Sequence, residues 1–391
     1  MKLNQCTLGL AALGLAGLSL GVRAQITNAP APIPLNTALS ATSISGYVDT
    51  SAVWAPGTGN GNPAPVAFNG PVKQDGFNLD SADVKIARLP DSGDWGAGYL
   101  FEAQYGPDAI NPFPGTPIRQ AYVELKVPIG KGLDVEVGQW DNILGYEAND
   151  DYKNPNWSRS YGYSMEPLTH TGILAAYKFS DAFGVQFGVA DTLTSGGNIT
   201  SGSVPGGTES KKAIVSLLSL TAPDSWGWLK GSCFYVGFDD GPGLVASDRQ
   251  HLYLGTTLNT SVKGLTFGAA WDSVWNNDIA TAVTPEIAHG VEGGYASAVA
   301  GYVNYALTDK ASLNGRVEYA HGGVTAPGDQ EFLAFTGTFQ YQWWDNVVNR
   351  LEVRWDHSGR GDQFGGPITA PPTVPTGKNQ VLLAANVIYK F

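Results

Sequence analysis

The 391-residue chain has little charge and almost no cysteine. Charged residues make up 15% of it, well below the roughly 25% typical of soluble domains. Its formal net charge of −12 lacks the basic excess that nucleic-acid binding requires, so no nucleic acid is expected as a partner. With only two cysteines, Cys6 and Cys233, the chain cannot build a metal centre from thiolates. The composition therefore argues against a soluble domain and against a nucleic-acid-binding protein.

Long apolar runs are confined to the N-terminus. A nearly unbroken apolar run over residues 8–22 follows a single cation, and a small-residue pattern ends it before Gln25. This pattern predicts a secretory signal peptide over residues 1–24 rather than a spanning helix. Its removal would leave Cys233 as the sole cysteine, so the processed chain is expected to form no internal disulfide. A Pro-rich N-terminal segment over residues 25–42 would then begin the exported protein.

Alternation takes the place of long runs in the rest of the chain. After residue 22 no apolar stretch approaches the ~18 residues that a membrane helix needs. A membrane β-strand needs only every second residue apolar, which fits a chain with 50 glycines, 17 tyrosines and 11 tryptophans. The last segment shows this period of two clearly. One of its faces carries Val381, Leu383, Ala385, Val387, Tyr389 and Phe391, and the other carries Gln380, Leu382, Ala384, Asn386, Ile388 and Lys390.

Sixteen segments of this kind follow one another at even spacing. Their connections alternate between short turns and long loops rich in glycine, proline and asparagine, as in outer-membrane barrels. We therefore predict an all-β fold over residues 43–391: a transmembrane antiparallel β-barrel of about 16 strands, with short periplasmic turns, long extracellular loops and periplasmic termini. The expected strands are 43–54, 76–89, 95–106, 116–127, 133–140, 169–179, 183–193, 211–221, 227–238, 249–260, 264–275, 292–307, 311–321, 330–341, 347–357 and 379–391. The expected long loops are 55–75, 141–168, 194–210, 276–291 and 358–378.

Tryptophans gather at the ends of the predicted strands. Two bands of aromatic side chains are typical of girdles at the two membrane interfaces. The tryptophans beside short turns are Trp95, Trp226, Trp228, Trp343 and Trp344, and those beside long loops are Trp54, Trp140, Trp275 and Trp355.

The second face of several strands is polar, and a 16-stranded barrel is too wide for side chains alone to fill. These polar faces predict a hydrated lumen. The predicted pore-lining residues are Glu124, Lys126, Asp134, Glu136, Arg316, Glu318, Arg350, Glu352, Arg354 and Asp356.

The connection over residues 141–168 is the longest and follows the fifth strand. A structureless loop of this length is more often functional than idle, so we predict that it folds into the lumen and narrows it, with the outer surface as the alternative. Carboxylates of this loop facing wall arginines across a narrow waist would create a transverse field that favours small polar solutes. The charged residues of the predicted constriction loop are Asp141, Glu147, Asp150, Asp151, Lys153 and Arg159.

Three stretches carry a resemblance to a known family. They are "GFNLDSADVKIARLPDSGDWGAGYLFEAQYGPDA", "LDVEVGQWDNILGYEANDDYKNPNWSRSYGYSMEPLTHTGILAAYKFSD" and the terminal "NVIYKF". Together they resemble the OmpL-like family of β-barrel porins, from about Ile44 to Phe391. The resemblance implies an outer-membrane porin without catalytic residues, with small solutes passing through it, outer-membrane lipid around it and a homotrimer as one option. It also implies an assembly signal for the barrel assembly machinery at Phe391 and Tyr389.

Other functions find little support in the sequence. The five histidines form no two-histidine metal spacing, so no metal and no cofactor are expected. The triplet Asp356-His357-Ser358 is faintly similar to a barrel hydrolase site, but neighbouring strand residues point to opposite faces. The "RGD" at residues 360–362 leaves a surface adhesin or structural barrel as an alternative. A diffusion porin of the outer membrane accounts for more of the pattern than either.

Overall fold

The computed structural model describes residues 42–57, 73, 75–90, 95–109, 117–193, 210–242, 248–276, 294–323, 329–366 and 374–391. Sixteen strands lie in this part of the chain, with short 3-10 helices η1 (Asp151–Lys153), η2 (Tyr163–Met165) and η4 (Asp224–Leu229). No helix within these ranges is long and apolar enough to cross a membrane. The strands are β1 (Ser43–Trp54), β2 (Gly76–Arg88), β3 (Gly96–Tyr105), β4 (Ile118–Val127), β5 (Leu133–Asp141), β6 (Thr169–Lys178), β7 (Phe183–Ala190), β8 (Ala213–Thr221), β9 (Cys233–Pro242), β10 (Asp248–Asn259), β11 (Leu265–Asn276), β12 (Gly294–Ala306), β13 (Ala311–Gly322), β14 (Gln330–Trp344), β15 (Val347–Ser358) and β16 (Asn379–Lys390).

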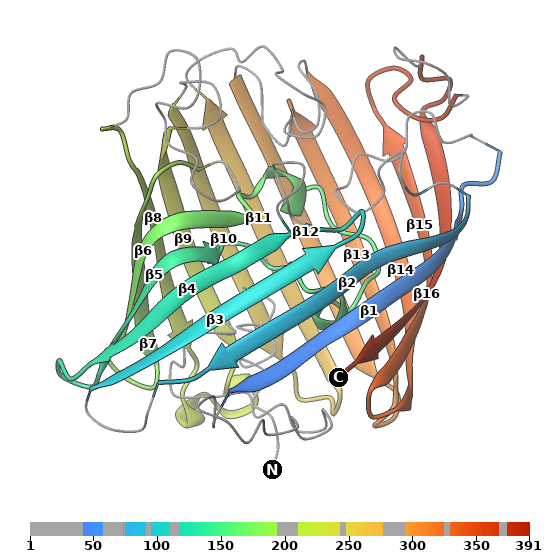
Figure 1. The fold of residues 1–391 in the computed structure, drawn as a ribbon. Coiled ribbons are helices and arrows are strands. Elements are labelled where there is room, and N and C mark those ends of the chain that lie inside the picture. Colours follow the sequence, from blue (N-terminus) through green and yellow to red (C-terminus); the bar gives the residue numbers. More distant parts are fainter. Residues whose placement is uncertain are drawn as a thin grey trace.

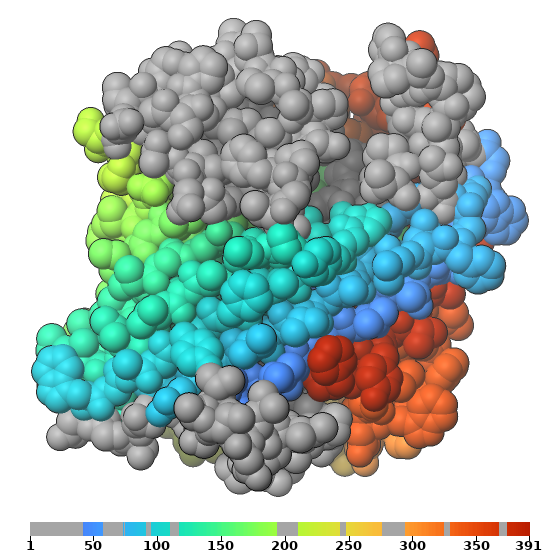
Figure 2. Space-filling model, viewed as in Figure 1, coloured from blue at the N-terminus to red at the C-terminus, as the bar shows by residue number. Residues whose placement is uncertain are grey.

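Each strand pairs with its neighbours in sequence, and β1 pairs with β16 to close the barrel. All the pairings are antiparallel, and Figure 1 shows the strands tilted around one interior. In Figure 2 the blue β1 lies directly against the red C-terminal strand, so no strand edge is left open on this side. Closure satisfies the backbone of every strand within the wall, which is the condition for crossing lipid with strands. The predicted 16-stranded antiparallel barrel is confirmed.

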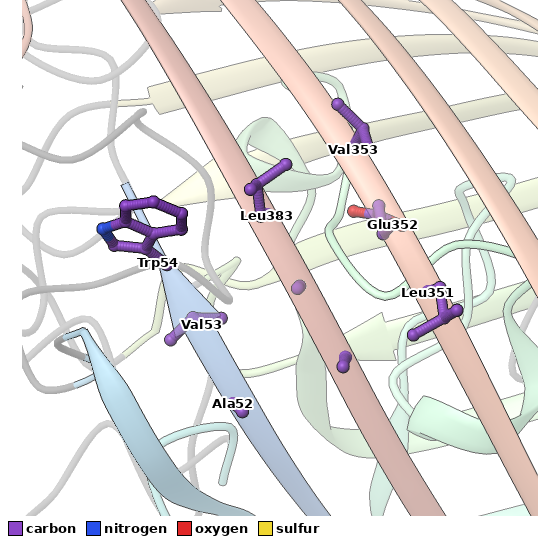
Figure 3. Close-up of a pocket in the computed structure, with 9 residues that line it drawn as sticks. Ala52, Val53, Trp54, Leu351, Glu352, Val353 and Leu383 are labelled. Atoms are coloured by element: carbon purple, nitrogen blue, oxygen red, sulfur yellow. The ribbon is translucent and has the colours of Figure 1, made fainter. Parts of the chain in front are cut away.

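The outer wall is apolar because alternate residues of each strand point outward. On β13, for example, Leu313, Val317 and Tyr319 are exposed, whereas their neighbours Arg316 and Glu318 are buried. The same alternation runs around the ring, which gives the barrel a lipid-facing belt. A shallow groove crosses this belt where Ala52 and Ala385 leave a dip. Figure 3 shows its larger lining side chains projecting from β1, β15 and β16: Trp54, Leu351, Val353 and Leu383.

The ninth strand differs from its prediction. It begins at Cys233 rather than at residue 227, because residues 224–229 form η4 instead of a strand. Pro223 precedes this turn, and Gly227 within it has a φ of 60°, a conformation that favours glycine. The exposed Trp226 and Trp228 imitated a strand's alternation, but they lie in a connection at the barrel end. Apolar alternation produced by interface aromatics therefore misled the assignment.

Several predictions fall on residues that the structure does not describe. The expected loops 194–210 and 276–291, most of 55–75 and residues 367–373 lie outside the described residues or nearly so. So do residues 1–41, which include the predicted signal peptide. Cys233 is buried at the start of β9 and is not a free thiol in the full-length chain. The expectation that the processed chain forms no disulfide stays a prediction.

Candidate functional site

The segment between β5 and β6, residues 142–168, lies inside the barrel, and we call it the inserted loop. Figure 1 shows its green turns within the ring of strands. The backbone N–H groups of Trp157 and Ser158 donate to the carboxylate of Glu352 on β15, at 2.7 and 3.0 Å. The N–H of Tyr161 donates to Glu318 on β13 at 2.7 Å. Carboxylates on the wall thus satisfy loop amides that would otherwise be buried without partners.

Arginines on β13 and β15 complete this attachment. Arg316 donates to the carboxylate of Glu147 at 2.6 Å and to the carbonyl oxygen of Ser158 at 2.8 Å. Arg354 donates to the carbonyl oxygen of Arg159 at 2.7 Å. Its guanidinium also lies 5.2 Å from the ring centre of Tyr161. Charge-assisted hydrogen bonds of this kind are the strong ones, so this half of the wall holds the loop firmly.

The opposite end of the loop is held by a buried charge network centred on Arg119 of β4. The Arg119 guanidinium contacts Asp141 and Asp150, both at 2.5 Å, and Glu102 at 3.2 Å. Lys153 also pairs with Asp150 at 2.6 Å. Burial alone would raise the pKa of the Asp150 carboxyl, but Lys153, Lys85 and Arg119 outweigh it and hold that pKa well below its usual range. Asp150 is therefore ionised inside the barrel.

The wall of β6–β12 carries an apolar interior face, which the sequence analysis did not predict. Leu174, Val215, Leu217 and Ala270 face inward here and are buried together with Ile143 and Leu144 of the inserted loop. The loop therefore has two sides, one apolar against β6–β12 and one polar against β13–β15. Trp140 belongs to this internal cluster and is 1% exposed, so its assignment to an interface girdle was wrong.

Inward-facing glycines make room for the apolar side of the loop. A Cβ atom at Gly237 of β9 would overlap Cδ2 of Leu144, and one at Gly268 of β11 would overlap the hydroxyl of Tyr146. The Tyr146 ring stacks on Tyr302 of β12 with 4.0 Å between ring centres and 18° between planes. These glycines work as sockets, because a larger residue would push the loop off the wall.

Trp157 anchors the loop against the closing strands. Its indole Nε1 donates to Asp80 of β2 at 3.1 Å, and Lys73 lies 4.8 Å from its ring centre. Its ring packs with buried Val53 and Leu382 on the inner faces of β1 and β16. One loop side chain thus contacts both strands that close the barrel.

A buried acidic cluster lies where the loop returns to β6. His251 of β10 sits between Asp239 and Asp272, with Nδ1–Oδ2 at 3.4 Å and Nε2–Oδ1 at 3.0 Å. Burial raises the pKa of Glu166 well above its usual value, and Asp272, Glu147 and Asp239 add to the effect. Among the described residues no group of three or more histidine, cysteine or carboxylate side chains is arranged to hold a metal ion. We interpret this cluster as part of the wall surface on which the inserted loop packs.

The predicted pore-lining residues all face the interior, but in two different situations. Those on β13 and β15, namely Arg316, Glu318, Arg350, Glu352, Arg354 and Asp356, lie beneath the inserted loop and are at most 3% exposed. Those on β4 and β5 pair across the strands, Lys126 opposite Asp134 and Glu124 opposite Glu136. The expected waist, with arginines facing loop carboxylates across a gap, is replaced by direct contact such as Arg316–Glu147 at 2.6 Å.

The constriction-loop residues are likewise brought into contacts. Asp141, Glu147, Asp150 and Asp151 are all buried, and Asp151 pairs with Arg159 at 3.0 Å. Lys153 keeps partial exposure. The functional residues that the sequence did not single out are Arg119, Lys85, Tyr152 and Lys390. Strand alternation places Lys85 on β2, Arg119 on β4 and Lys390 on β16 inward, so these three could have been predicted from the sequence.

Two other motifs have ordinary surroundings. The Nδ1 atom of His357 contacts Asn379 at 2.8 Å, and its ring stacks on Trp355, whereas Ser358 is buried toward the interior. The two residues therefore point to opposite faces of β15. In the RGD loop, Arg360 pairs with Asp329 at 2.5 Å.

The C-terminal residue of the chain takes part in closing the barrel. The N–H of Phe391 donates to the carbonyl oxygen of Gly46 at 3.0 Å, and the Gly46 N–H donates back at 3.1 Å. Tyr389 lies on the lipid-facing row and is exposed.

Comparisons with known proteins agree with this architecture. Residues 41–391 match the family described as putative beta-barrel porin-2, OmpL-like. Comparison with curated protein sequences gives no match. Similar solved structures include an anion-selective porin from Comamonas acidovorans, with 11% identity and a TM-score of 0.59, covering 90% of this chain and 99% of that one.

Two further structures share the fold. OprB of Pseudomonas putida has 11% identity and a TM-score of 0.56, with 90% and 94% of the two chains covered. In vitro folded OmpT of Vibrio cholerae, described as a trimer form, has 10% identity and a TM-score of 0.55, with 90% and 99% covered. At such identities these likenesses concern the fold, whereas the family match spans the whole barrel. The chain therefore belongs to the OmpL-like β-barrel porins and is an outer-membrane channel protein.

Proposed function

We propose that the protein is a general diffusion porin, which lets small hydrophilic solutes and ions pass through a water-filled passage narrowed by the inserted loop. The observation that carries this proposal is the attachment of the loop to the inside of the wall, through the Glu352 carboxylate and the Arg316 guanidinium. A segment held in the lumen limits the size of the solutes that can pass, and it leaves the hydrogen bonds between the wall strands intact.

The polar and apolar halves of the interior have separate tasks in this proposal. The apolar cluster around Leu144 and Leu217 seals the loop to β6–β12, since buried apolar surface leaves no path for a hydrated ion. The passage then follows the side of the loop where Tyr152 and Lys153 keep partial exposure. Solutes are selected by size and charge there.

Single-channel recording in planar bilayers tests the proposal. Folded protein should give stepwise, ion-conducting openings, and excision of residues 145–161 should raise the single-channel conductance because the obstruction is removed. A matched control is excision within the periplasmic connection 223–230, outside the lumen, which should leave conductance unchanged. Folding of each variant is checked by heat-modifiable migration. Absence of conducting steps from folded protein would overturn the proposal.

Export and assembly complete the proposed function. We propose that residues 1–24 are removed as a signal peptide and that residues 25–42 precede the barrel in the mature protein. The barrel assembly machinery would read Phe391 and Tyr389, and surrounding outer-membrane lipid would contact the apolar belt. A homotrimer is supported by the trimer form of the similar OmpT structure. N-terminal sequencing tests the removal of residues 1–24. Native mass in mild detergent tests the homotrimer.

A further inference from the structure

The solvent-accessible charges inside the barrel are nearly all cationic, although the chain is acidic overall. Among the described residues of the inner wall and inserted loop, the carboxylates are buried except for Asp134. Five lysines of the same surfaces keep partial exposure: Lys85, Lys126, Lys153, Lys178 and Lys390. An ion entering the passage therefore meets ammonium groups before it meets carboxylates.

Four of these lysines lie near acids: Lys153 pairs with Asp150 at 2.6 Å and Lys85 pairs with Glu102 at 3.2 Å. Lys126 lies directly across the strands from Asp134, and Lys178 pairs with Asp181 at 3.1 Å. Lys85, Lys153 and Lys390 come from three distant parts of the chain: β2, the inserted loop and the end of β16.

Two of these, Lys153 and Lys390, lie beside the same aromatic ring. The Nζ atoms of Lys153 and Lys390 lie 5.8 and 5.7 Å from the ring centre of Tyr152. Lys85 Nζ lies 3.8 Å from Asp150, the carboxylate that Lys153 also contacts. We call Lys85, Lys153, Lys390 and Tyr152 the lysine patch. Both strands that contribute to it do so near the barrel end that carries the C-terminus, which places the patch on the periplasmic side of the loop.

The carboxylates next to the lysine patch are buried, and two of them also contact Arg119. Asp150 and Glu102 are buried, and Arg119 contacts both of them, at 2.5 and 3.2 Å. Asp83 is buried, with one carboxylate oxygen lacking a hydrogen-bond partner. No carboxylate among the described residues lies within 4.0 Å of Lys390 Nζ. Because these carboxylates are buried, the partly exposed charges of the patch are its ammonium groups.

The ring of Tyr152 is held in place between them. Tyr47 meets it edge-on with ring centres 5.2 Å apart, and the Tyr47 hydroxyl accepts a hydrogen bond from Gln104 at 3.0 Å. A fixed ring flanked by ammonium groups is preorganised, so an anion that binds there orders little of the protein.

We propose that the lysine patch is a binding site for small anionic solutes carrying a carboxylate or phosphate group, and that it makes the channel prefer anions. The proposal rests on the proposed diffusion function and names the charge class of its solutes. An anion would bind beside Tyr152, between the ammonium groups of Lys153 and Lys390, and leave toward the periplasm.

Reversal potentials in a KCl gradient test the preference. Wild-type protein should favour chloride over potassium. Each of Lys153→Gln and Lys390→Gln should lower the chloride-to-potassium permeability ratio by about twofold, from Coulomb's law at ~6 Å in water with screening over about 8 Å. Lys310→Gln is the matched control, because it removes the same charge from an exposed periplasmic turn between β12 and β13.

Inorganic phosphate provides a second readout. Phosphate added to the periplasmic side should reduce chloride current in wild-type protein, and the double variant of Lys153 and Lys390 to Gln should lose most of this block. Conducting channels that prefer potassium, or patch variants indistinguishable from Lys310→Gln in both measurements, overturn the anion site and leave the diffusion function standing. Folded protein without any conductance overturns the diffusion function instead.

Discussion

The carboxylate of Glu352 accepts a hydrogen bond from the backbone N–H of Trp157 at 2.7 Å, although the two residues are 195 positions apart in sequence. The second carboxylate oxygen of Glu352 accepts the N–H of Ser158 at 3.0 Å. A single wall side chain thus fixes the turn of the inserted loop that crosses the barrel. Because the bonds are to backbone groups, this clamp depends on the wall residue rather than on the loop's side chains.

Replacing Glu352 should therefore loosen the loop. In Glu352→Gln only one oxygen remains as acceptor and the charge is lost, which should cost about 1–3 kcal/mol of local stability. We expect larger current fluctuations in the open channel and a higher mean conductance. Glu136→Gln is the control, because Glu136 is an interior-facing glutamate that contacts Tyr122 and lies across from Glu124. Equal noise in the two variants would contradict the clamp.

Filling a socket should also displace the loop. In Gly237→Ala the new methyl group overlaps Leu144, and overpacking of a buried contact costs about 1–3 kcal/mol. Gly337→Ala on β14 is the matched control, since a Cβ atom there has no neighbour within 4 Å. The free energy of unfolding in urea should fall in the first variant and stay unchanged or rise in the second. Adding Leu144→Ala to Gly237→Ala should restore part of the loss; no difference between the two glycine variants would exclude the socket.

The buried acidic cluster around Glu166 should contribute less to the stability of the fold as pH rises. Burial and three neighbouring carboxylates raise the pKa of Glu166, so the folded state binds its proton more tightly than the unfolded state does. The stability this contributes is fully present below the unfolded pKa of about 4.3 and is lost as pH rises toward the raised folded value. Glu166→Gln should remove that dependence.

Unfolding free energies at pH 4 and pH 8 measure the effect. At pH 8 Glu166→Gln should be more stable than wild type, because the buried carboxyl of wild type then favours the unfolded state. At pH 4 the two should agree. The outward-facing Glu331→Gln serves as the control at both pH values. A Glu166→Gln variant with the same stability difference at both pH values would argue that the carboxyl stays ionised.

Removing Phe391 should impair barrel assembly. The deletion takes away both backbone hydrogen bonds to Gly46 at the seam between β1 and β16, together with the ring that packs over Gly46. We expect several-fold less heat-modifiable barrel in the outer membrane of the deletion strain. Phe391→Tyr keeps the backbone pair and the ring and should assemble at the wild-type level. Normal amounts of the deleted form would refute a role for this residue in assembly.

The sequence by itself determined the barrel and its lipid-facing row. Alternation of apolar residues is local, because side chains two positions apart share a face whatever the rest of the chain does. The terminal strand, with Tyr389 and Val387 on the exposed side, could therefore be assigned without a structure. The same logic failed at residues 227–232, where Trp228 lies in a turn although the ninth strand was predicted to begin at residue 227.

Only the tertiary structure decided what the interior residues do. Alternation places Arg316 and Lys390 on the same inner surface, but one is buried under the loop and the other remains accessible. That difference depends on where residues 142–168 fold, and some of the contacts that hold them there, such as Arg316–Glu147 and Tyr161–Glu318, join positions more than 150 apart in sequence. Exposure and pairing of a charge are properties of such distant contacts, because desolvation and Coulomb energy depend on spatial neighbours and not on sequence neighbours.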